Sequence, residues 1–67
     1  MKINIGDLVV LKSGDSNGNL IYFNKIGFIQ QITGNLAYIT FPELSKIHAW
    51  HIKYFEPNEY YQWEFIK

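Results

Sequence analysis

The sequence predicts an all-β fold, and three observations lead to this prediction. Aromatic residues make up 18% of the 67-residue chain, and aromatic and β-branched side chains favour strands. Arginine is absent, and alanine, the best helix former, occurs only at Ala37 and Ala49. Clusters of Gly, Asn, Asp and Pro interrupt the apolar runs at short intervals, as they do between strands. A chain of this length forms one domain around a single core.

The first strand is predicted directly after the turn signal Gly6-Asp7. Its apolar residues alternate between two faces, so that Val9 and Leu11 point to one side and Leu8 and Val10 to the other. The strand therefore presents apolar side chains on both of its faces.

The connector that follows combines a turn with an apolar run. Ser13 to Gly18 is the strongest turn cluster in the chain, and Leu20 to Phe23 are four consecutive apolar residues. Two interpretations of this run stay open. Either it folds over one end of the domain and hides Leu20 and Tyr22, or it projects as a contact element.

A β-hairpin is predicted for Ile26–Ile32 and Leu36–Phe41, joined by a tight turn at Thr33–Asn35. Within the first arm, Gly27 marks a place where backbone approaches closely or bulges. Pro42 ends the second arm, because proline has no N–H to donate to a neighbouring strand.

A fourth strand is predicted over Ile47–Ile52, with a tight turn at Lys53–Phe55. It carries His48 and His51, the only two histidines. An odd spacing of three places their side chains on opposite faces of a strand. We therefore interpret them as surface or partly packed residues beside Trp50, and not as paired metal ligands.

The tail, Asn58–Lys67, is dense in aromatic residues. A period of two places Tyr61, Trp63 and Phe65 on one face, which predicts a closing strand. The alternative is a short helix beginning at Pro57, because proline suits the first helical turn.

Three segments between residues 3 and 57 follow one another in a characteristic order. The first is Ile5-Gly6-Asp7 with Val9, Leu11 and Gly14, the second is Gly27-Phe28-Ile29 with Ile32 and Ala37–Phe41, and the third is Ile52–Pro57. This order resembles KOW-type domains and other small SH3-like barrels, in which the third segment supplies a short turn and the final strand. The resemblance implies a five-stranded SH3-like barrel over residues 1–57, with residues 58–67 packed on it as an aromatic strand or tail. It also implies that the loops bind RNA, DNA or protein.

Charge and cysteine content narrow the classes of function. Six basic and six acidic residues give a net charge of zero, whereas nucleic-acid-binding domains usually carry a positive excess. Without cysteine, the chain has neither a disulfide nor a thiolate metal site. No apolar run approaches the roughly 20 residues of a membrane helix, and no signal-peptide pattern is present. We therefore expect a cytoplasmic protein without membrane contact.

Catalytic chemistry finds no support in the sequence. The serines lie in turn-forming contexts, the carboxylates are dispersed, and neither a Gly-x-Ser-x-Gly motif nor a phosphate-binding glycine loop occurs. We predict a protein that is not an enzyme, with no catalytic residue, no cofactor and no metal site.

A small barrel has room for a modest number of interior side chains. The predicted core consists of Ile5, Val9, Leu11, Ile29, Ile32, Ala37, Ile39, Phe41, Ile52 and Phe55. Eight aromatic residues then lie wholly or partly outside it: Tyr22, Phe23, Tyr38, Trp50, Tyr54, Tyr60, Tyr61 and Trp63. They form either an outer layer under the tail or a contact surface, and tyrosine and tryptophan are enriched at interface hot spots.

The predicted function is a non-catalytic protein-binding module, acting as a small accessory subunit or as an inhibitor of a larger host enzyme, of the kind that viruses and mobile elements encode. The predicted partner-binding residues are Leu20, Ile21, Tyr22, Phe23, Tyr38, Trp50, Tyr54, Tyr60 and Trp63. The alternative is a KOW-like RNA- or DNA-binding module that uses Lys12, Lys25, Lys46 and Lys53 around the same aromatic residues. A third hypothesis is a homo-oligomer that hides the Leu20–Phe23 run.

Overall fold

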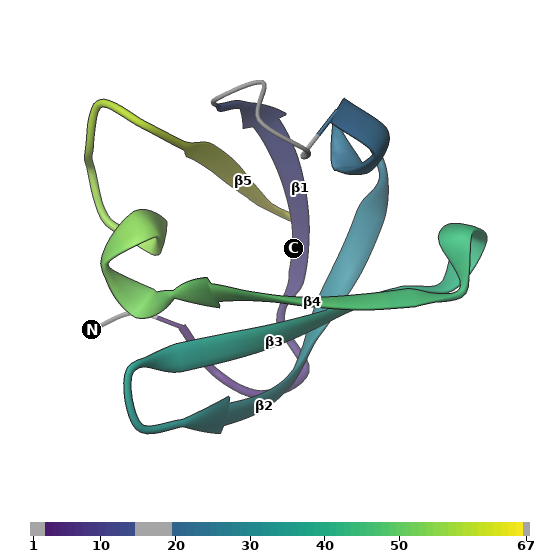
Figure 1. Ribbon diagram of the computed structural model, residues 1–67, viewed down its shortest axis with the longest axis horizontal. Helices are drawn as coiled ribbons and strands as arrows, with labels where there is room; N and C mark the ends of the chain where they lie inside the picture. The colour runs from purple at the N-terminus through teal and green to yellow at the C-terminus, as the bar shows by residue number, and fades with distance from the viewer. Residues whose placement is uncertain (1–2, 15–19, 67) are drawn as a thin grey trace.

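Five antiparallel strands form a single sheet in the computed structural model, which describes residues 3–14 and 20–66 (Figure 1). The strands are β1 (Leu8–Ser13), β2 (Ile26–Thr33), β3 (Leu36–Phe41), β4 (Lys46–His51) and β5 (Gln62–Ile66). Three short 3₁₀-helices connect them: η1 (Leu20–Tyr22), η2 (Pro42–Leu44) and η3 (Ile52–Phe55). The all-β prediction is confirmed. Across the described residues, no helix has the length and apolar character needed to cross a membrane.

The strand order is β4-β3-β2-β1-β5, which leaves β4 and β5 at opposite edges of the sheet. The sheet bends strongly along β2, so that β3 and β4 run across β1 and β5 in Figure 1. One face of the sheet is thereby turned inward and encloses the core, and the other face lies outside.

The predicted hairpin is confirmed as β2 and β3. Thr33 pairs with Leu36 across the two-residue turn Gly34-Asn35, and Gly34 adopts a φ of 59° that favours glycine. A β-bulge between Ile29 and Gln31 shifts the register of the pair and adds to the local twist.

Gly27 allows β2 to lie against the inward side chains of β3. A Cβ atom at this position would stand 2.7 Å from Ile39 Cγ2 and 2.9 Å from Phe41 Cε1, and both of those residues are fully buried. The predicted close approach at Gly27 is confirmed.

The last strand differs from the one that the family resemblance implies. Residues Ile52–Phe55 form η3, and the fifth strand is β5, which pairs with β1 from Leu8↔Ile66 to Ser13↔Gln62. Two hydrogen bonds favour a turn here, because the Lys53 N–H donates to His51 Nδ1 (3.1 Å) and the Ile52 N–H donates to the Asn35 carbonyl (2.8 Å). The predicted tight turn at Lys53–Phe55 and the predicted strand in the tail are confirmed, and the alternative helix from Pro57 is wrong.

Six of the ten predicted core residues are fully buried: Val9, Leu11, Ile29, Ala37, Ile39 and Phe41. Ile32, Ile52 and Phe55 are partly buried and pack against this cluster. The prediction for Ile5 is wrong, because its side chain is 64% exposed. Ile5 belongs to the turn that precedes β1, where the period of two does not apply.

Tyr22 and Trp50 are the larger correction, since both were predicted to lie wholly or partly outside the core. They are 6% and 4% exposed. Trp50 pairs across the sheet with Ala37, whose small side chain leaves space for the indole ring. Tyr22 packs on Phe41 with ring centroids 4.8 Å apart and meets Trp50 edge to face at 5.5 Å. The connector thus hides Tyr22 against the core, as the first of the two interpretations expects, whereas the Leu20 side chain lies outside the described part of the structure.

Two contacts hold the apolar run against β1. Phe23 forms a bridge with Leu11, and the Asn24 N–H donates to the Leu11 carbonyl at 3.0 Å. Most of the predicted turn cluster, residues 15–18, lies outside the described part of the chain.

Candidate functional site

Aromatic side chains surround a hollow between η3 and β5, which we call the aromatic groove. It encloses about 260 Å³ and is lined by Tyr54, Phe55, Glu56, Pro57, Tyr61, Gln62, Trp63 and Phe65. Residues that belong to η3 and to the tail therefore form its two sides, since β5 returns past η3 to pair with β1.

The rings beside the groove contact one another closely. Tyr54 meets Tyr61 at 4.7 Å and Tyr60 at 6.1 Å between ring centroids, both edge to face. On the other side, Phe55 stacks on Trp63 at 4.7 Å. Edge-to-face and stacked pairs of this kind add roughly 0.5–1.5 kcal/mol beyond the area they bury, so the rings hold one another in place.

Asn58 fixes the segment that carries Tyr60 and Tyr61. Its Oδ1 accepts hydrogen bonds from the backbone N–H groups of both tyrosines, each at 2.7 Å. Its Nδ2 donates to the carbonyls of Tyr54 (3.0 Å) and Glu56 (2.7 Å). The asparagine side chain thus joins η3 to the start of the tail and sets the position of Tyr60, a residue that is 55% exposed.

Charged groups lie around the rings. Lys53 Nζ is 5.2 Å from the centroid of the Tyr54 ring, a distance at which a cation is attracted to the ring face. Glu56 and Glu59 are exposed on the same segment. The surface is therefore aromatic at its centre and mixed in charge at its border.

Three of the predicted partner-binding residues, Tyr54, Tyr60 and Trp63, lie together in or beside the aromatic groove. Tyr22 and Trp50 are buried in the core and present no surface. Tyr38 is half-buried on β3, where it pairs with Gln31 and Ala49 and takes no part in the groove.

The remaining predicted contact residues belong to the connector. Leu20 and Ile21 are the first residues of η1, and Ile21 is 49% exposed, whereas Phe23 is half-buried. Sequence reasoning missed the role of Asn58 and assigned Phe55 to the core. An Asn directly after a Pro is a turn signal that could have indicated the former.

The four lysines of the alternative function come from four different segments. Lys12 and Lys46 are exposed on β1 and β4. Lys25 forms an ion pair with Glu43, Nζ to Oε2 at 2.6 Å, and Lys53 lies over Tyr54. Two of the four cations thus already contact a protein group.

The two histidines occupy opposite faces of β4, as predicted, because His48 pairs with the buried Ile39 and His51 with the exposed Leu36. The His48 ring lies 4.3 Å from Trp50 and 5.2 Å from Tyr22. Burial against these rings lowers the pKa of His48 below its ordinary value of 6.5, because desolvation disfavours the charged imidazolium.

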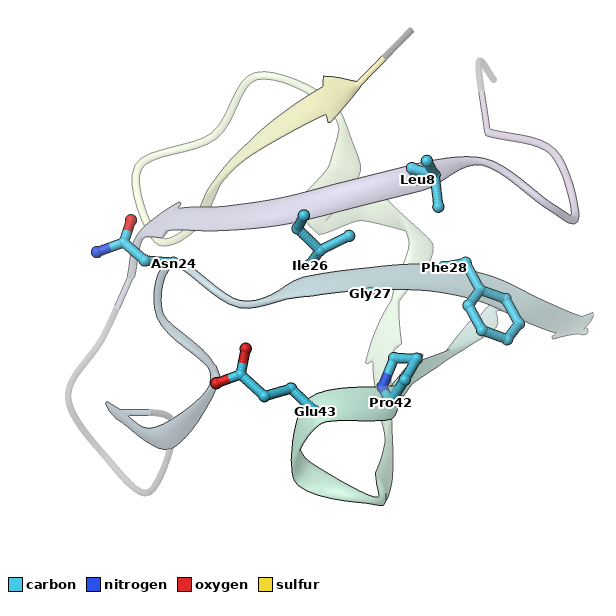
Figure 2. A pocket seen from close by; sticks show the side chains of 7 residues that line it. All are labelled: Leu8, Asn24, Ile26, Gly27, Phe28, Pro42 and Glu43. Carbon is cyan, nitrogen blue, oxygen red and sulfur yellow. The ribbon is translucent and has the colours of Figure 1, made fainter.

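A second hollow lies on the outer face of the sheet (Figure 2). This outer groove encloses about 350 Å³ and is lined by Leu8, Asn24, Ile26, Gly27, Phe28, Pro42 and Glu43. Leu8 comes from β1, Ile26 and Phe28 from β2, and Pro42 from η2, and their side chains surround the opening in Figure 2. None of the residues that line the outer groove was predicted to bind a partner. The apolar residues on both faces of the first strand could have indicated an apolar surface here.

Comparisons of this chain with protein-family models, with curated proteins and with solved structures found no match.

Proposed function

We propose that this protein is a non-catalytic protein-binding module that contacts its partner through the aromatic groove. The observation that carries the proposal is the position of Tyr60, which is 55% exposed beside Tyr54 and held there through Asn58. An aromatic side chain that is fixed before binding loses little conformational entropy on contact. Tyrosine also offers a large apolar face together with a hydroxyl group, a combination enriched at interface hot spots.

The finer fold that we propose is an SH3-like barrel. Two observations support it. The strand order places β5 beside β1 and β4 at the far edge, and the rings of Trp50 on β4 and Trp63 on β5 come within 4.9 Å of each other. The inward faces of the two edge strands therefore meet through side chains.

A binding role without catalysis is supported by the structural roles of several polar side chains. Asp7 Oδ2 accepts the Asn4 N–H at 2.8 Å, His51 Nδ1 accepts the Lys53 N–H at 3.1 Å, and Glu43 pairs with Lys25. Each of these groups stabilises a turn or joins two segments. We propose that a module of this size acts by docking, as an accessory subunit or an inhibitor of a larger enzyme.

The test is site-specific photocrosslinking in the source cell, with a photoreactive phenylalanine analogue in place of Tyr60. Tyr38, which lies on β3 away from the groove, is the matched control position. We expect a protein adduct from position 60 that is absent from position 38. Adducts with RNA or DNA would instead favour the alternative function, and equal adducts from both positions would remove the aromatic groove from consideration.

The affinity for the identified partner then separates the two classes of binding. Tyr60→Ala is expected to weaken it by about 10- to 30-fold, the effect of losing a hot-spot side chain worth roughly 1–2 kcal/mol. Raising the salt concentration from about 50 to 200 mM is expected to change it little, whereas contacts to several phosphates would lose orders of magnitude. A steep salt dependence would contradict an apolar protein contact.

A further inference from the structure

The outer face of the sheet bears an apolar surface that the aromatic groove does not include. Leu8, Ile26 and Ile66 are 42%, 54% and 37% exposed. Leu8 pairs directly with Phe28 on one side and with Ile66 on the other, so these side chains lie on the same face of three neighbouring strands. Leu8 and Ile26 also line the outer groove together with Phe28 and Pro42.

Strands β1 and β2 are apolar on both faces at this place. Inward, Val9 and Ile29 are fully buried, and outward, Leu8 and Ile26 point to the solvent. An antiparallel sheet with one solvated face normally carries polar residues on that face. Apolar residues on both faces are typical of a sheet that is covered on both sides. In the described part of the chain Val10 on this face is buried, whereas Leu8 and Ile26 remain 42% and 54% exposed.

We propose that a second copy of this chain covers the outer groove and forms a two-fold symmetric dimer. In such a dimer the same surface contacts itself, so each residue must find its complement within that surface. The border of the outer groove meets this condition, because Glu43 lines the groove and holds the opposite charge of Lys25 beside it in an ion pair. A two-fold axis through the groove places Lys25 of one copy opposite Glu43 of the other and the reverse.

The net charge of the chain and its accessible surface area are both compatible with a second copy over the outer groove. Two copies with a net charge of zero meet without overall repulsion. A stable interface takes about 800 Å² from each partner, which is about a fifth of the 4403 Å² that one chain exposes.

Sedimentation equilibrium over a range of concentrations tests the proposal. The wild-type chain of 7.9 kDa is expected to reach twice this mass. Ile26→Glu is expected to raise the dimer dissociation constant by about 100-fold, because a two-fold dimer contains the substitution twice and each loss is worth about tenfold. The matched control is Leu36→Glu, since Leu36 is 39% exposed at the opposite end of β3 from Pro42 and does not line the groove; it is expected to leave the constant unchanged.

Charge exchange tests the symmetry of the contact. Lys25→Glu alone and Glu43→Lys alone are each expected to weaken the dimer of that variant. An equimolar mixture of the two variants is expected to form dimers again, because one copy then carries two acidic groups and the other two basic groups, and opposite charges meet only between the copies. Circular dichroism on each variant confirms that the monomer remains folded. A wild-type chain that stays monomeric up to about 1 mM, a species heavier than a dimer, or equal effects of Ile26→Glu and Leu36→Glu would each overturn the proposal.

The dimer and the partner contact use different surfaces, so the two proposals fail separately. Loss of the dimer through Ile26→Glu with unchanged crosslinking from position 60 leaves the aromatic groove in place. An intact dimer without any adduct at position 60 removes the proposed function and leaves the dimer.

Discussion

The indole rings of Trp50 and Trp63 meet edge to face with their centroids 4.9 Å apart and their planes at 80°, although their strands lie at opposite edges of the sheet. Both Nε1 groups are buried without an oxygen or nitrogen acceptor in the part of the chain that the structure describes. Edge-to-face packing is the arrangement in which an indole N–H can point at a ring face, a weak hydrogen bond. This contact joins the core to the groove-lining side of β5.

Trp50→Ala is expected to lower the free energy of unfolding by about 3–5 kcal/mol, because it leaves a cavity in the centre of the core. A domain of this size has a total stability of only about 3–5 kcal/mol, so the variant is expected to be largely unfolded. Trp63→Ala, at a half-buried position, is the control and should lose less. Urea titrations followed by circular dichroism measure both. A loss below about 1 kcal/mol for Trp50→Ala would contradict the packing described above.

Gly27→Ala is expected to cost about 1–3 kcal/mol, the usual effect of overpacking a core. The added methyl group would lie 2.7 Å from Ile39 Cγ2, and the fully buried Ile39 and Phe41 have little room to move. Lys12→Ala on the neighbouring β1 is exposed and should stay within about 0.5 kcal/mol of the wild type. Thermal and urea unfolding measure the stability of both variants. Equal stability of the two would show that β2 has space for a methyl group at Gly27.

Asn58→Ala removes four hydrogen bonds, two to the carbonyls of Tyr54 and Glu56 and two from the backbone N–H groups of Tyr60 and Tyr61. We expect a loss of about 1–3 kcal/mol and faster hydrogen exchange at the amide of Tyr60. Asn58→Asp keeps an acceptor for the two tyrosine amides but loses the Nδ2 donor, so its effect should be intermediate. Exchange at Tyr60 that is as slow in Asn58→Ala as in the wild type would mean that the segment is held by other contacts.

The stability of the fold is expected to decrease as the pH falls below 6.5, the ordinary pKa of histidine. Burial lowers the pKa of His48 in the folded state, so between the two pKa values the unfolded chain binds more protons than the folded chain. This contribution is fully present above pH 6.5 and is lost as the pH falls toward the lowered value. His48→Gln should flatten the curve above about pH 5, where carboxylates titrate little. Urea midpoints measured across this range provide the test, and an unchanged slope in His48→Gln would contradict it.

Local sequence patterns predicted most of the elements. The turns at Gly6-Asp7 and Thr33–Asn35, the end of β3 before Pro42 and the closing strand in the tail all follow from residues that are close together in the chain. The alternation of Ala37, Ile39 and Phe41 also identified the inward face of β3, because a period of two depends on backbone geometry alone.

The sequence by itself therefore determined the fold class, the five strands including the one in the tail, and the aromatic character of that tail. Only the tertiary structure decided which rings are hidden: Trp50 is buried because Ala37 opposite it is small, and Tyr22 because η1 carries it onto Phe41. It also decided that Leu8 and Ile26 share an open face, while Tyr54 and Tyr60 meet beside a groove. Such contacts depend on how distant segments fill a common volume, and the periodicity of one strand carries no information about the size of the side chain that it will meet.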